Sequence, residues 1–221
     1  MIETEYLDPT NIKIYQDKDL YCFTSDALRL AEFTKVKKDD VVADFCAGSG
    51  VVGFYLYGLN QNQIENLTFF EMQKPLFELS KKSIELNRLE NKIFAENVKL
   101  QEIDNRYFGR FSLIVCNPPY MPTENGFCDK DENIAICRSE KMLKLDELLS
   151  SVSKCLKYGG RVCLVHRADR LIDVICGMRE KGIEPKRLQF CSAKNKDPYL
   201  FFIEGVKGGK SGLKVLSAIK N

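Results

Sequence analysis

Short apolar runs alternate with amphipathic stretches along most of the chain, and this alternation constrains the fold more than any other feature. Runs rich in β-branched and aromatic residues predict strands at 40–45, 67–71, 93–98, 112–116, 161–166, 187–191 and 199–206. Strands that alternate with helices are typical of an α/β fold built on a mostly parallel sheet, with helices on both of its faces.

Two of the intervening helices have clear signals. A helix is predicted over 75–89, because Pro75 stands in its first turn and leucines follow at helical spacing. A second helix is predicted over 25–33, with Thr24 or Ser25 as its N-cap. The strand at 40–45 also leads through a small-residue turn into a helix that begins near Val51.

Length and composition indicate one globular domain. The chain has 221 residues, of which 44% are hydrophobic and 29% charged, and one core of ordinary size accounts for a chain of that length. No apolar run approaches the roughly 18 residues of a membrane span. The N-terminal residues are acidic and do not resemble a signal peptide, so we expect a cytoplasmic protein that does not enter the membrane.

The counts of cysteine and histidine exclude several kinds of chemistry. The 9 cysteines are scattered from Cys22 to Cys191 without any Cys-x-x-Cys pair, which favours reduced, mostly buried thiols over disulfides or a zinc site. His166 is the single histidine of the sequence, which argues against a Ser-His hydrolase or a multi-histidine metal centre. We therefore expect no metal ion.

Charge is distributed unevenly, although the net charge is only +2. From Lys154 to the last residue there are 15 Lys and Arg residues against 6 Asp and Glu residues, so the earlier part of the chain is acidic. A basic region on an otherwise acidic body is typical of enzymes that bind polyanions. The same pattern also fits basic residues on an ordinary solvated surface.

The turn after the first predicted core strand has the features of a cofactor site. Gly48 and Gly50 allow the backbone to approach a ligand closely, and the next strand ends in Glu71, which can hold both hydroxyls of a ribose. With Gly53 the spacing also fits a dinucleotide site, so spacing alone leaves NAD open. Asp44 favours a different ligand, because its carboxylate repels a pyrophosphate and suits the sulfonium and α-ammonium groups of S-adenosylmethionine.

The predicted strand 112–116 runs directly into Asn117-Pro118-Pro119-Tyr120. The carboxyl ends of strands face the ligand crevice of an open α/β sheet, so this tetrapeptide is expected beside the cofactor. The prolines remove two N–H donors, which leaves carbonyl acceptors beside the Asn117 amide oxygen. Such acceptors can orient an exocyclic amine for methyl transfer, and Tyr120 offers a ring on which a flipped base can stack. We expect all four residues to be catalytic.

On these residues the chain resembles, over nearly its whole length, the bacterial tRNA methyltransferases that form N6-methyladenosine beside the anticodon of a valine tRNA. The matching segments are 23–31, the glycine turn, 70–73, Asn117 to Tyr120, 134–140, 160–162 with 165–167, and 207–216. The Asn-Pro-Pro-Tyr motif is shared by several amino methyltransferases, so it indicates the chemistry, and the flanking segments indicate the family.

The resemblance implies a Rossmann-like class I methyltransferase with a seven-stranded sheet whose last strand is antiparallel. It also implies S-adenosylmethionine as cofactor and tRNA as substrate. A single domain over 1–221 is expected, with a cap segment at 1–38, a catalytic core at 39–206 and a basic tail at 207–221. A monomer is expected.

The family pattern also assigns roles in cofactor binding. Residues at the methionine end of the cofactor would be Asp44, Cys46, Gly48 and Gly50, with Asn117 beside them. Glu71 would hold the ribose and Met72 would flank the adenine. Relatives usually carry an aspartate where this chain has Asn97, whose amide oxygen can still accept the adenine amine, so weaker cofactor binding is expected.

RNA binding is expected to use basic residues of the C-terminal third and one residue near the catalytic loop. The candidates for phosphate contact are Arg138, Arg167, Arg170, Lys207 and Lys210. Other readings are a glutamine N5-methyltransferase of peptide release factors, a guanine N2-methyltransferase of ribosomal RNA, and an inactive RNA-binding module. The roughly 40 residues before Val41 are too few for the helical domain that precedes the cofactor domain of the release-factor enzymes.

Overall fold

The computed structural model of the protein describes residues 2–20, 25–119, 143–193 and 196–220. Its strands are β1 (Ile2–Tyr6), β2 (Lys13–Asp17), β3 (Asp40–Phe45), β4 (Ile64–Glu71), β5 (Ile93–Asn97), β6 (Phe111–Cys116), β7 (Leu156–Arg167), β8 (Ile183–Ser192), β9 (Pro198–Lys207), β10 (Lys214–Val215) and β11 (Ile219–Lys220). Its helices are α1 (Ser25–Phe33), α2 (Val51–Leu59), α3 (Lys74–Leu86), α5 (Leu145–Cys155) and α6 (Leu171–Glu180), with short 3-10 turns at Leu100–Glu102, Asn105–Tyr107 and Ala168–Arg170.

The strands from β3 to β9 form one sheet in the order β8-β9-β7-β6-β3-β4-β5. The pairs among β3, β4, β5, β6 and β7 are parallel, whereas β9 lies antiparallel to both β7 and β8. The predicted α/β fold, with seven main strands and an antiparallel last one, is therefore confirmed. The parallel strands end at one edge of the sheet, called here the carboxyl edge, and begin at the opposite amino edge.

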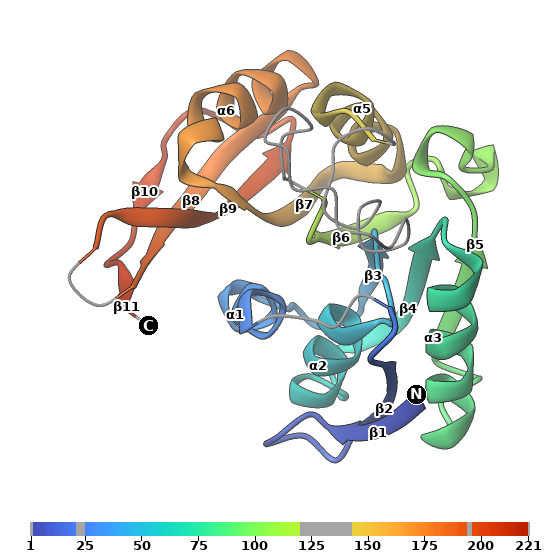
Figure 1. The fold of residues 1–221 in the computed structure, drawn as a ribbon. Helices are drawn as coiled ribbons and strands as arrows, with labels where there is room; N and C mark the ends of the chain where they lie inside the picture. Colours follow the sequence, from blue (N-terminus) through green and yellow to red (C-terminus); the bar gives the residue numbers. More distant parts are fainter. Residues whose placement is uncertain (1, 21–24, 120–142, 194–195, 221) are drawn as a thin grey trace.

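Helices cover both faces of this sheet (Figure 1). Buried residues of α1, α2 and α3 pack against one face, and those of α5 and α6 pack against the other, so the core has two layers separated by the sheet. Strand β6 is buried along its whole length because it lies in the middle of the sheet. No helix within the described ranges is long and apolar enough to cross a membrane.

The predicted elements agree with the observed ones in position and differ at their ends. The strand at 40–45 and the helix at 25–33 have the predicted bounds, while β7 and β8 begin several residues earlier than predicted. Helix α3 ends at Leu86 instead of Leu89, because Arg88 has a positive φ of 56° that a helix cannot contain. The proposed cap Thr24 lies outside the described residues.

The cap segment contains a hairpin of β1 and β2 that the sequence did not reveal. Hydrogen bonds tie β2 to α3 and to its C-cap residue Asn87. The Tyr15 N–H donates to Ser83 Oγ at 2.9 Å, the Lys13 N–H donates to Asn87 Oδ1 at 3.0 Å, and Asn87 Nδ2 donates to the Lys13 carbonyl at 2.6 Å. At the other end of the chain, the basic tail adds β10 and β11 to the sheet, where both run parallel to β8.

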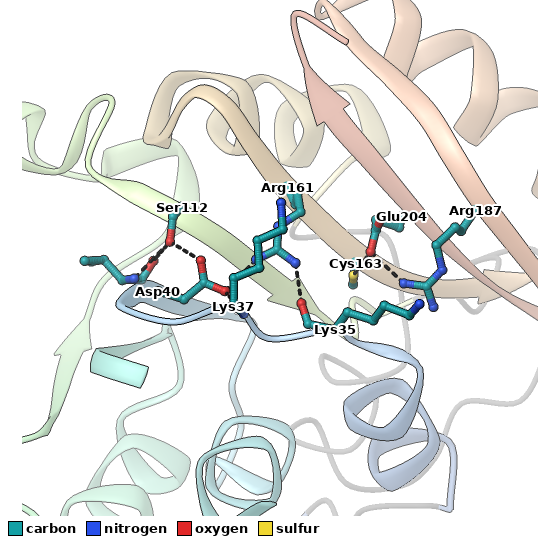
Figure 2. Close-up of polar contacts among 9 residues, drawn as sticks. Lys35, Lys37, Asp40, Ser112, Arg161, Cys163, Arg187 and Glu204 are labelled. Carbon is teal, nitrogen blue, oxygen red and sulfur yellow. Dashed lines mark hydrogen bonds and ion pairs between the residues drawn. The ribbon is translucent and has the colours of Figure 1, made fainter. Parts of the chain in front are cut away.

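A buried polar network holds the amino edge of the sheet together (Figure 2). The Asp40 carboxylate receives the guanidinium of Arg161, the hydroxyl of Ser112 at 2.7 Å and the Lys37 N–H at 2.7 Å. Arg161 also donates to the Lys35 carbonyl. Both side chains of the Arg161–Asp40 pair are only 6% exposed. These contacts join β3, β6 and β7 to the segment that follows α1.

A second ion pair lies beside the first (Figure 2). Arg187 of β8 contacts Glu204 of β9 at 2.8 Å and donates to the Phe33 carbonyl at 2.8 Å. Its guanidinium also lies 4.4 Å from the centre of the Phe33 ring, within the range of a cation–π contact. Because Phe33 is the last residue of α1, this pair fixes the end of that helix to β8 and β9.

We expect the Arg161–Asp40 pair to dominate the electrostatic contribution to stability. Asp40→Ala leaves a buried guanidinium without its charge partner and should lower the free energy of unfolding by about 3–5 kcal/mol. The control is Glu102→Ala, which removes the exposed Lys99–Glu102 pair at 3.6 Å and should cost less than about 1 kcal/mol. Urea unfolding compares the two variants, and equal effects would contradict this account of the network.

Candidate functional site

The carboxyl edge brings together residues that are far apart in the sequence. In the register of the sheet, Phe45 pairs with both Phe70 and Cys116, and Glu71 pairs with Asn97. The segments that follow β3, β4, β5 and β6 therefore meet at one place. They carry the predicted cofactor and catalytic residues.

The glycine turn between β3 and α2 has the backbone that its sequence requires. Gly48 and Gly50 have positive φ values of 58° and 90°, and Cys46 has a φ of 58°, which is rare for a residue with a side chain. A Cβ on Gly50 would stand 2.8 Å from the Phe69 ring, whereas one on Gly48 would meet nothing within 4 Å. The turn is thus packed from behind at Gly50 and faces open space at Gly48.

Asp44 is fully buried behind this turn. Its Oδ2 accepts the Gly53 N–H at 2.8 Å, and its Oδ1 has no hydrogen-bond donor among the described residues. Burial raises the pKa of Asp44 to about 8; the hydrogen bond from Gly53 opposes this shift and the nearby Glu71 charge adds to it. Burial therefore makes Asp44 easier to protonate than an exposed aspartate.

Gly53 is required by packing against Asp44 and the core. A Cβ at this position would lie 2.4 Å from the Phe69 ring and 3.0 Å from Asp44 Oδ2. This close packing accounts for glycine at position 53, and no bound pyrophosphate is needed to explain it. The Gly-x-Gly-x-x-Gly spacing consequently gives no support to NAD.

Glu71 organises the backbone around the turn. Its Oε2 accepts the Gly48 N–H at 2.8 Å, and its Oε1 accepts the Gln73 N–H at 2.8 Å. Burial raises the pKa of Glu71, and the hydrogen bonds from the Gln73, Gly48 and Met72 backbone oppose that shift. Each carboxylate oxygen can accept a further hydrogen bond, so the expected fork to a ribose fits this arrangement.

Asn97 uses its amide nitrogen to hold the end of β4. Its Nδ2 donates to the Glu71 carbonyl at 2.8 Å and to the Met72 carbonyl at 3.1 Å. A carboxylate here could make neither contact, because it has no hydrogen to donate. The amide oxygen consequently faces away from these carbonyls, as the expected contact with an adenine amine requires.

Asn117 stands directly after β6, and its Oδ1 is buried without a donor among the described residues. Leaving such an acceptor unsatisfied costs roughly 1–3 kcal/mol. Pro118, which is buried, and Pro119, which is partly exposed, follow without N–H groups of their own. Tyr120, the fourth predicted catalytic residue, lies outside the described residues.

Gln16 lies at the candidate site, although no sequence motif indicated it. It is 5% exposed, and its Nε2 donates to Ser49 Oγ inside the glycine turn, so the N-terminal hairpin contacts the cofactor turn directly. The sequence signal that could have revealed it is the alternation of buried residues, from Ile12 just before β2 to Ile14 and Gln16 within the strand.

The predicted RNA-binding residues do not gather at one place. Arg167 and Arg170 lie at the carboxyl edge, in ion pairs with Asp169 and Asp173 at 2.6 Å. Lys207 lies at the amino edge, where its ammonium donates to two carbonyls near the end of α5. Lys210 follows Lys207 there, and its carbonyl accepts from Lys186. Arg138 lies outside the described residues.

Within the described ranges, no group of three or more His, Cys, Asp and Glu side chains is arranged to hold a metal ion. Three acceptor atoms at the candidate site are buried and have no donor among the described residues. They are Gln16 Oε1, Asp44 Oδ1 and Asn117 Oδ1. The arrangement is suited to a ligand that brings hydrogen-bond donors and positive charge.

The titration of Asp44 predicts a pH dependence of stability. In the unfolded chain this carboxyl ionises near pH 4, whereas in the folded protein it keeps its proton up to about pH 8. The folded state binds the extra proton between these values, so the free energy of unfolding falls as the pH rises from about 4 to about 8.

Asp44→Asn keeps an acceptor for Gly53 and removes the titration. The stability of the parental protein relative to this variant should fall by up to about 1.4 kcal/mol per pH unit within that window. Urea unfolding at several pH values gives both curves, with Glu65→Gln on an exposed position of β4 as the control. Parallel curves for the parental protein and Asp44→Asn would show that Asp44 is already ionised.

Curated relatives resemble the chain over most of its length. A protein of Flavobacteriaceae bacterium (strain 3519-10) is 25% identical over 201 residues, covering 82% of each chain. One of Shewanella putrefaciens (strain CN-32) is 27% identical over 158 residues, covering 69% of this chain and 64% of the relative. Both relatives are named tRNA1(Val) (adenine(37)-N6)-methyltransferase.

Solved structures share the fold at low sequence identity. A predicted O-methyltransferase of Agrobacterium tumefaciens has a TM-score of 0.68 at 16% identity, covering 88% of this chain and 86% of the other. The TYW2 protein of M. jannaschii in complex with AdoMet has a TM-score of 0.65 at 12% identity, covering 92% of this chain and 84% of the other.

A family-level match covers the cofactor turn and the Asn-Pro-Pro segment together. Residues 24–172, more than half of the chain, match the family described as Methyltransferase small domain. The span runs from the start of α1 to the start of α6, and so includes all four strand ends that form the site. The chain therefore belongs to the methyltransferase small domain family.

Proposed function

We propose that this protein transfers a methyl group from S-adenosylmethionine to the exocyclic N6 of an adenine in tRNA. The observation that carries the proposal is the Asn117 Oδ1, which is buried without a donor among the described residues; it lies just after β6, one strand away from the glycine turn. An acceptor kept without a donor fits a substrate that arrives with an N–H group.

The residues at the carboxyl edge fit S-adenosylmethionine, which supplies an electrophilic methyl group on a sulfonium. Asp44 lies behind the glycine turn, and one of its oxygens has no donor in the part of the chain that the structure describes, while Gly48 leaves open space in front of it. Glu71 would hold the ribose hydroxyls, and Asn97 Oδ1 would accept the adenine amine. Met72, partly exposed beside them, would flank the adenine ring.

Cys46 and Gly50 would complete the wall at the methionine end of this cofactor. A cation near Asp44 favours the ionised carboxylate and lowers its pKa. The cation of the bound cofactor would therefore oppose the effect of burial and favour the charged carboxylate, which compensates for the positive charge brought into the site.

The acceptors at Asn117 would act on the substrate amine. The Asn117 Oδ1 and the Pro118 carbonyl would each accept one N–H hydrogen, which turns the nitrogen lone pair toward the methyl group. The N–C bond would form as the S–C bond of the sulfonium breaks, with S-adenosylhomocysteine as the leaving group and the amine proton released to solvent. Positioning and fixed dipoles would supply most of the rate enhancement, with no strong base needed. Tyr120 would support the flipped base by stacking.

The names of the curated relatives support tRNA as the substrate and the adenine beside the anticodon of a valine tRNA as the target. Such an enzyme would work in the cytoplasm, and we propose that it acts as a monomer and without a metal ion. Arg167 and Arg170 lie at the same edge as Asn117 and remain candidates for RNA contact, together with Arg138. Lys207 and Lys210 are left out because they lie at the amino edge.

The direct test is mass spectrometry of nucleosides from tRNA that has been treated with the protein and isotopically labelled S-adenosylmethionine. We expect labelled N6-methyladenosine, with Asn117→Ala lowering kcat by about 10²- to 10³-fold, as for the loss of one preorganised electrostatic partner. Asn117→Asp keeps an acceptor and should retain part of the activity.

Labelled N2-methylguanosine, or label found only in a release-factor protein, would replace this proposal with the corresponding alternative. Parental single-turnover rates in Asn117→Ala would show that the Asn-Pro-Pro segment is structural. A protein that labels none of these substrates would act as a binding module instead.

Cofactor binding is tested separately from methyl transfer. Glu71→Ala should weaken S-adenosylmethionine binding by about 1–3 kcal/mol, because it removes charged hydrogen bonds to the ribose. Glu65→Ala, at an exposed position near the other end of β4, is the matched control and should bind as the parental protein does. Calorimetry measures both, and unchanged affinity in Glu71→Ala would remove Glu71 from the site.

A further inference from the structure

A pocket lies at the carboxyl edge, between the end of β7, the start of β9 and the first turn of α1. It has a cavity volume of about 470 Å³, within the range typical of small-ligand sites. Its described lining comes from three segments: Asp26, Arg167 to Asp169, and Pro198 to Leu200. Among these lining residues, only Arg167 has a role proposed above, as a candidate for RNA contact.

The register of the sheet places this pocket close to Asn117. Cys116 pairs with Leu164 of β7, so Asn117 stands level with the next residue of that strand, Val165. Arg167, which lines the pocket and pairs with Leu200 of β9, lies two residues further along β7. With roughly 4.8 Å between strands and 3.3 Å per residue, the backbone separation is on the order of 10 Å. A nucleotide next to the one at Asn117 can span that distance.

The walls of the pocket suit a neutral aromatic ring better than a phosphate. The Tyr199 ring is 41% exposed and is flanked by Pro198 and Leu200. Two carboxylates, Asp26 and Asp169, stand against the single guanidinium of Arg167, so the pocket is not an anion site.

Polar groups of the pocket are held in place by neighbouring contacts. Asp169 receives two hydrogen bonds from Arg167, at 3.1 and 2.6 Å, which fix the plane of the guanidinium. The Tyr199 hydroxyl lies 3.8 Å from the Cys191 sulfur. Asp26 is 8% exposed, and a buried carboxylate is an acceptor for an amino group. A stacking ring with acceptors beside it is the pattern that recognises a nucleobase.

We propose that this cavity, the Tyr199 pocket, receives the base of a nucleotide adjacent to the methylated adenine in the RNA strand. The base stacks on Tyr199, and its exocyclic amine donates to Asp26. The inference rests on the proposed RNA substrate and adds to it a second point of contact. Two anchored bases define the direction of the strand, which a single flipped base does not.

The test measures binding of a fluorescently labelled RNA stem–loop that contains the target adenine, in the presence of S-adenosylhomocysteine. Tyr199→Leu removes the ring and keeps apolar volume, so it should raise Kd by about 5- to 100-fold. Tyr199→Phe keeps the ring and should stay within about twofold of the parental protein. Asp26→Asn should raise Kd several-fold while S-adenosylhomocysteine binding stays unchanged.

Stem–loops with an abasic site on either side of the target adenine identify the base that enters the pocket. One of them should bind the parental protein as weakly as the intact RNA binds Tyr199→Leu, and Tyr199→Leu should lose no further affinity for it. The assignment of the pocket would be overturned if the losses from the abasic site and from Tyr199→Leu were additive, or if Tyr199→Leu bound the intact RNA with parental affinity. Methylation of the same RNA would in either case leave the proposed function standing. Absence of RNA binding and of methylation by the parental protein would overturn both.

Discussion

The buried pair of Arg161 and Asp40 is the interaction on which the arrangement of the molecule depends. It joins three central strands and the segment after α1 at a place that water does not reach. Arg187 of the neighbouring ion pair donates to the carbonyl of Phe33, the last residue of α1. Because α1 runs between this contact and the carboxyl edge, polar groups at the amino edge help to fix the position of Asp26 in the first turn of α1.

The positions of most strands along the chain could be predicted from the sequence, because they follow from local patterns. The apolar run of β6 and the Asn-Pro-Pro segment after it are adjacent in the chain, so their proximity required no tertiary information. Gln16 and Ser49 are different, since their contact joins two segments that carry no shared motif. The Tyr199 pocket likewise joins α1, β7 and β9, and only the fold brings these elements together.

Sequence patterns also could not show how the site side chains are already used. Asp44 was expected to face a cofactor, and the structure shows one of its oxygens bound to Gly53 and the other buried. Asn97 was expected to weaken cofactor binding relative to aspartate, which stays a prediction. The structure shows a separate role: its amide nitrogen donates to two carbonyls, which an aspartate could not do. The identities of these residues indicated the kind of ligand to expect. Only the structure shows which of their atoms already have hydrogen-bond partners in the protein.

The contact between Arg187 and the Phe33 carbonyl spans 154 residues of chain. Contacts of such long range form late when a protein folds, because the loop they close has a large entropy. During synthesis on the ribosome, α1 emerges long before the strands that anchor it. The end of α1 can thus reach its final position only after β8 and β9 have joined the sheet, so the carboxyl edge beside α1 is completed late.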